Sequence, residues 1–198
     1  MTEFDAGGVY IMPQRANSKE LEGIFFVRSG LFKNAVFRFN LVLDSNYPQQ
    51  KNAPVITLNT NVPVSHPLIH PQTLVFDSSS AFPVWNEDHI YELLKFFKYS
   101  FENMDYSCAV NHPSNHAAVD LYNKDREQFS ENAKETVTRT INEVFASNEV
   151  ASASNKNFIF SYDKSINEEN LHDQILENMK NFSDSSIENF SFSFDRRG

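Results

Sequence analysis

The stretch VFRFNLVL (residues 36–43) carries the clearest β-strand pattern in this sequence. Its apolar side chains alternate with Arg38 and Asn40, which predicts a strand with one buried face and one partly solvated face. This strand, placed at Ala35–Leu43, is accompanied by three further apolar segments that turn-prone residues separate. They are residues 9–11, 23–27 and 54–58. Four strands in series predict an antiparallel meander.

Downstream of these strands the apolar pattern becomes helical. Residues 59–83 contain four prolines, which remove backbone donors at intervals, so we expect a long irregular loop. Asn86 can cap a following helix, and two more helices are predicted after it. The apolar positions of the first helix are Ile90, Leu93, Leu94, Phe97, Phe101 and Met104, and those of the next two run from Ala117 to Phe145. Strands followed by helices predict an α+β domain over residues 8–146.

The composition changes after this domain. Residues 147–157 (SNEVASASNKN) are small and polar, which is typical of a linker. Residues 158–198 form a C-terminal extension with a strand-like segment at 158–160, a helix from about 167 to 180, and an end that we expect to be flexible. The extension is rich in Phe, so we expect the part near 158–180 to fold back on the domain rather than to dock on a partner.

Charge and hydropathy exclude several classes of function. A formal net charge of −9 argues against nucleic-acid binding, because that binding depends on clustered Lys and Arg. No segment approaches the roughly 18–20 apolar residues that span a bilayer, and the N-terminus lacks the features of a leader. The single Cys108 cannot form an internal disulfide, which fits a reducing compartment. We therefore expect a cytoplasmic protein without direct membrane insertion.

Short motifs along the chain resemble those of the ubiquitin-conjugating-enzyme fold. They are Asn46-Tyr47-Pro48 with Pro54, His66-Pro67, Phe82-Pro83-x-Trp85, Ala117-Ala118, Leu121-Tyr122, Asp125-Arg126 and Phe129. A closer similarity connects the chain to the Fused Toes or AKT-interacting-protein group, called crossbronx in insects, whose members lack the active-site cysteine. It is carried by residues 8–11, 23–26, 30–32, 36–39, 66–68, 81–85 and 87–90 and extends to about Lys180. Only seven residues precede Gly8, so we expect the N-terminal helix of the fold to be missing from this chain.

The resemblance implies that the groups for catalysis are replaced. Ubiquitin transfer uses a Cys thiolate as covalent carrier and an Asn amide that stabilises the oxyanion. Counting onward from His66-Pro67, the carrier falls at Val75 or Phe76, and the Asn falls at Leu68. The vestigial site of His66, Pro67, Leu68, Val75 and Phe76 therefore predicts a protein that is not an enzyme.

Cysteine and histidine offer weaker candidates for chemistry. Cys108 lies more than thirty residues past the expected carrier position, and we interpret it as a small packed side chain. The pairs His66 with His70 and His112 with His116 have the i, i+4 spacing of metal ligands. Both pairs lie in proline-interrupted segments, so we expect neither a metal nor a cofactor.

Acidic and serine residues give no better site. Asp44, Asp77 and Asp88 fall in different loops, which favours solvated surface positions over a catalytic pair of acids. Ser78-Ser79-Ser80 lacks the G-x-S-x-G context of a serine hydrolase. Neither set predicts an enzyme of unrelated chemistry.

The resemblance to the Fused Toes group implies a non-catalytic adaptor. Its expected partners are a Hook-type coiled-coil protein and a Hook-interacting protein, in a complex for vesicle and endosome trafficking that holds the chain peripherally at membranes. One alternative is a variant that binds ubiquitin non-covalently or partners an active conjugating enzyme. Another is kinase binding, which only the second name of the group implies. No sequence feature identifies the partner-binding surface.

Overall fold

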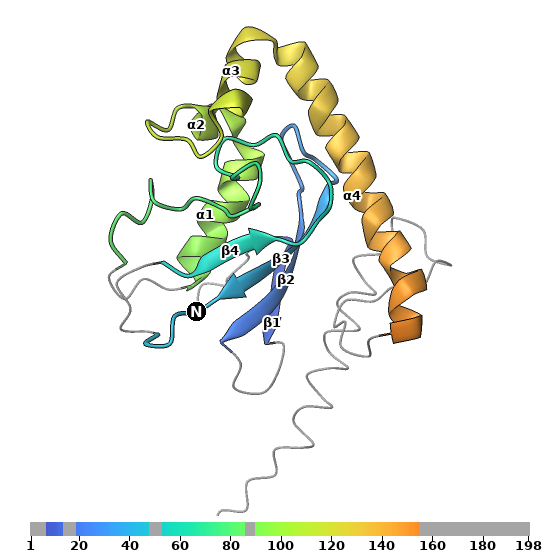
Figure 1. The fold of residues 1–198 in the computed structure, drawn as a ribbon. Helices are drawn as coiled ribbons and strands as arrows, with labels where there is room; N and C mark the ends of the chain where they lie inside the picture. Colours follow the sequence, from blue (N-terminus) through green and yellow to red (C-terminus); the bar gives the residue numbers. More distant parts are fainter. Residues whose placement is uncertain (1–6, 14–18, 48–52, 86–89, 155–198) are drawn as a thin grey trace, which may run out of the picture. The chain divides into compact units, whose positions relative to one another are not determined.

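Four antiparallel strands and four helices make up the described part of the chain (Figure 1). The computed structural model describes residues 7–13, 19–47, 53–85 and 90–154, with the side chains of 144–154 excepted. The strands pair in the order β1 (Val9–Pro13), β2 (Glu20–Phe26), β3 (Val36–Val42) and β4 (Val55–Leu58). The helices are α1 (Ile90–Glu102), α2 (Met104–Cys108), α3 (His116–Lys124) and α4 (Arg126–Ser154). The predicted α+β class and the four-stranded meander are confirmed.

Pairing with β3 sets the length of β2 and the orientation of its side chains. Glu20 pairs with Val42 and Phe26 with Val36, so β2 begins three residues before the predicted segment 23–27. The face opposite the core is more buried than the alternation predicted, since Arg38 is only 7% exposed. Its long apolar stem can lie along neighbouring side chains, which lets a charged residue share a largely buried face.

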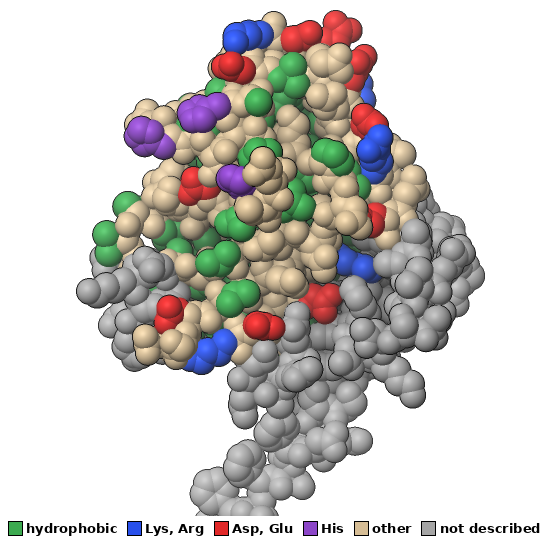
Figure 2. Space-filling model, viewed as in Figure 1, with side chains coloured by type: hydrophobic (Ala, Val, Ile, Leu, Met, Phe, Trp, Pro, Cys, Tyr) green, Lys and Arg blue, Asp and Glu red, His purple; other side chains and the backbone are tan. Residues whose placement is uncertain are grey.

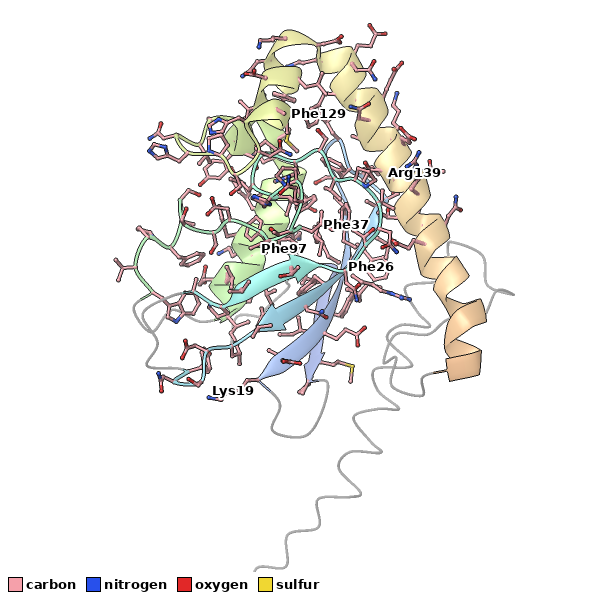
Figure 3. The ribbon with its side chains drawn as sticks, in the orientation of Figure 1. Lys19, Phe26, Phe37, Phe97, Phe129 and Arg139 are labelled. Atoms are coloured by element: carbon pink, nitrogen blue, oxygen red, sulfur yellow. The ribbon has the colours of Figure 1, made fainter. Side chains whose placement is uncertain are left out.

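Helix α1 packs its aromatic side chains on the core face of the sheet. The Phe97 ring centroid lies 5.3 Å from that of Phe25 and 5.3 Å from that of Phe39. The Phe101 centroid lies 5.0 Å from that of Phe37, and Figure 3 shows Phe37 and Phe97 between the helix and the strands. Aromatic pairs at such distances contribute about 0.5–1.5 kcal/mol each beyond the burial of their area. The rings therefore fix α1 on the sheet.

The first predicted helix is divided in two. Helix α1 ends at Glu102, and Met104, predicted as its last apolar position, begins α2. Asn103 causes the break, because its backbone is non-helical (φ −127) and its side chain accepts a hydrogen bond from the Tyr106 N–H. Asn86, the predicted cap of the first helix, lies outside the described residues.

The later helices hold the irregular loop 59–83. Asn115, the cap of α3, donates its backbone N–H to the Pro67 carbonyl at 2.9 Å. In α4, the Glu143 carboxylate accepts a hydrogen bond from the Thr60 hydroxyl. These contacts place the predicted loop against two helices far along the chain.

Helix α4 extends further than predicted. Residues 147–157 were predicted to be a linker, and within them the helix continues through Ser154. Ser and Asn are less favourable than Ala in a helix by no more than about 0.7 kcal/mol each, and Ala151 and Ala153 favour the helix. Residues 1–144 form one compact unit.

Some predictions concern residues that the structure does not describe. The strand-like segment 158–160, the helix 167–180 and the end of the extension are among them, as are residues 1–6.

Among the described helices, none combines the length and the hydrophobicity that crossing a membrane requires.

His66 anchors the middle of the loop to α1. Its buried ring stacks on Phe101 with the centroids 4.2 Å apart. Its Nε2 lies 3.1 Å from the Ser100 carbonyl oxygen, and its Nδ1 lies 3.1 Å from the Leu68 backbone nitrogen. The Leu68 N–H can only donate, so Nδ1 accepts and Nε2 carries the proton that is donated to Ser100. Burial lowers the pKa of His66 to about 4, although the hydrogen bond to Ser100 opposes this shift.

Gly23 in β2 is required by the close approach of Phe39. A Cβ atom at this position would lie 2.2 Å from Cζ of Phe39, whose ring is fully buried. The ring covers the glycine and has little open space to move into, because it is fully buried and Phe97 of α1 packs against it.

The Gly23→Ala variant is expected to lower the free energy of unfolding by about 1–3 kcal/mol, the usual cost of overpacking a core. Urea denaturation of the 198-residue protein measures this change. In a Phe39→Leu background the same substitution should cost less, since the shorter side chain leaves room for the methyl group. An equal cost in both backgrounds would contradict the proposed clash.

The free energy of unfolding should depend on pH through His66. Its pKa is about 4 in the folded chain and about 6.5 when unfolded, so the unfolded state binds the proton first as pH falls. The folded state therefore loses stability between these two values, by about 2 kcal/mol from pH 7 to pH 5. Urea denaturation of the parent and of His66→Gln at both pH values isolates this contribution. Equal pH-dependent losses in the two proteins would show that His66 does not cause it.

Candidate functional site

The predicted carrier position lies at the edge of the sheet. Val75 forms an isolated antiparallel bridge with Thr57 of β4, and the Phe76 N–H donates to the Ile56 carbonyl at 2.9 Å. The Phe76 side chain is only 4% exposed, and its ring centroid lies 5.0 Å from that of Phe97. The Phe76 side chain thus anchors this segment in the aromatic core. A residue that carries ubiquitin covalently would instead have to be exposed.

Leu68 occupies the predicted oxyanion-donor position with an apolar side chain. The side chain is fully buried. Its backbone N–H donates to His66, and its carbonyl accepts from the Asp77 N–H at 2.8 Å. Both backbone groups of Leu68 are therefore used within the loop, and its side chain provides no donor for an oxyanion.

A tight turn leads from the vestigial motif to the carrier position. The His70 Nδ1 accepts a hydrogen bond from the Thr73 N–H at 3.1 Å, and the His70 N–H donates to the Val75 carbonyl at 2.9 Å. Leu74 lies between them in a left-handed conformation (φ 57), which is costly for a side chain of this size. His66 and His70 are thus both used as hydrogen-bonding residues within the loop.

The other histidine pair does not share one helical face. His112 lies in the loop before α3, and His116 is the first residue of that helix. Among the described residues, no group of three or more His, Cys, Asp or Glu is placed to hold a metal ion.

Cys108 lies at the end of α2 and is half-buried. Burial raises the pKa of its thiol to about 11, the negative charge of Asp105 adds to this shift, and Arg126 opposes it. Its surroundings therefore suppress the thiolate, the form that acts as a nucleophile.

Asp77 links two loops instead of pairing with another acid. Its Oδ1 accepts from the Ser79 N–H at 2.9 Å, and its Oδ2 accepts from the Ser114 hydroxyl at 2.8 Å. Burial by itself would raise the pKa of Asp77, but the hydrogen bonds from Ser79 and Ser114 outweigh it and lower the pKa. Asp44 closes a different turn by accepting from the Asn46 N–H at 2.7 Å. Asp88 lies outside the described residues.

Two grooves lie beside the vestigial site, and the sequence did not predict them. The carrier groove has a volume of about 500 Å³ and is lined, among others, by Val55, Thr73, Val75, Phe76, Phe82 and Pro83. The tyrosine groove has a volume of about 370 Å³ and is lined by Ser80, Tyr106, Ala109, Val110, Asn111 and His112. Ser79 lines both grooves. Both volumes are in the range of ligand-binding sites, about 300–1,000 Å³.

One signal in the sequence pointed to part of this arrangement. An Asp followed by serines often forms a turn in which the carboxylate accepts a backbone N–H, as Asp77 does with Ser79. The contact with Ser114 and the grooves themselves arise from segments far apart in the chain, which local patterns do not relate.

Known proteins share the fold of this chain and show the family to which it belongs. The sequence profile of the family described as "Ubiquitin-conjugating enzyme" matches residues 2–137. A solved structure titled "Novel Ubiquitin-Conjugating Enzyme" superposes with a TM-score of 0.53 at 19% identity, covering 65% of this chain and 81% of the other. At that identity the likeness shows the fold alone.

Two curated relatives are similar over most of the chain. The crossbronx homolog of Culex quinquefasciatus is 31% identical over 181 residues, which cover 89% of this chain and 74% of the relative. The crossbronx protein of Drosophila virilis is 33% identical over 144 residues, which cover 70% of this chain and 58% of the relative. The family profile and these relatives together show that the chain belongs to the ubiquitin-conjugating-enzyme family and, within it, to the crossbronx group.

Proposed function

We propose that this protein is a non-catalytic variant of the ubiquitin-conjugating enzymes that acts as an adaptor in a Hook-type complex for vesicle and endosome trafficking. The buried Phe76 at the predicted carrier position is the observation that carries the non-catalytic part. A phenyl ring cannot form a thioester, and this ring is held by Phe96 and Phe97, with centroids 5.6 Å and 5.0 Å away. Without a covalent carrier, the transfer mechanism has no first step.

Neighbouring groups do not replace the missing chemistry. The Leu68 side chain has no amide to stabilise an oxyanion, and losing one such donor alone costs roughly 10²- to 10³-fold in rate. With a pKa of about 11, the Cys108 thiol is ionised in only about one molecule in 10⁴ at pH 7. A folded domain of this family that lacks the covalent carrier can still bind other proteins.

The adaptor part of the proposal rests on the family. The chain belongs to the crossbronx group, and its resemblance to the Fused Toes proteins implies a Hook-type coiled-coil protein and a Hook-interacting protein as partners. The matched residues cover 74% and 58% of the two relatives, so these partners are proposed for this chain and not transferred as known. Through them the chain would act at vesicle membranes as a peripheral component.

Incubation with ubiquitin-activating enzyme, ATP and ubiquitin is expected to give no thiol-sensitive ubiquitin adduct on this chain. The Phe76→Cys variant should also fail, because its thiol would be buried against Phe96 and Phe97 and Leu68 would still provide no donor. Non-reducing gel electrophoresis reads out the adduct, with an active conjugating enzyme as positive control. An adduct on the parent that disappears in Cys108→Ser would show that the chain is a catalyst after all.

Co-expression with the C-terminal fragment of a Hook-type protein should yield a complex that survives affinity purification and size-exclusion chromatography. The expected result is stoichiometric co-elution, and a Hook fragment without this C-terminal part serves as the control. A parallel titration with labelled ubiquitin distinguishes the non-covalent ubiquitin-binding alternative. Co-elution absent for Hook-type fragments from several species, with ubiquitin bound instead, would replace the adaptor proposal by that alternative.

A further inference from the structure

We draw no further inference here: the strongest candidate, the exposed apolar surface around the two grooves, where Val55 and Tyr106 lie and hydrophobic side chains gather in Figure 2, is an apolar face for which nothing in the described part of the structure shows what covers it.

Discussion

The hydrogen bonds of the neutral His66 ring hold the vestigial site in position. One nitrogen accepts from the loop at Leu68 and the other donates to α1 at Ser100. Phe97 and Phe101 fix helix α1 on the sheet. The His66 ring therefore holds the loop in a defined position relative to the sheet. A protonated ring would bring a second N–H against the Leu68 N–H and would leave a buried charge unpaired. These two uncharged hydrogen bonds therefore fix the start of the segment that leads to the predicted carrier position.

The parts of the fold with a strong local period could be predicted from the sequence. The alternation within 36–43 gave β3 its register, and the spacing of Leu93, Phe97 and Phe101 located α1. The division at Asn103 was missed because the apolar spacing continues to Met104, and only the capping side chain ends the helix. The extension of α4 to Ser154 was not predicted, because the small polar residues there give no apolar period and the helix continues from the turns before them.

Counting along the sequence predicted a position for the candidate site but could not describe its geometry. Spacing from His66-Pro67 assigned the carrier to Val75 or Phe76, while their pairing with β4 and the burial of Phe76 depend on contacts between distant segments. The grooves were beyond prediction for the same reason, since Ser80 and Tyr106 meet only in the folded chain. Catalytic sites generally sacrifice stability by holding polar groups in apolar surroundings. Here Leu68 and Phe76 are buried apolar side chains, and each can contribute about 1.5–3 kcal/mol to folding.

The pairing of residues 74–76 with β4 also protects the sheet against unwanted association. A strand at the edge of a sheet presents free N–H and C=O groups that can pair with another chain and start aggregation. On the side of β4 away from β3, the Leu58 N–H donates to the Leu74 carbonyl and the Ile56 carbonyl accepts from the Phe76 N–H. The segment that holds the predicted carrier position therefore covers this edge. Because the Phe76 ring is buried against Phe97, it keeps this cover in place.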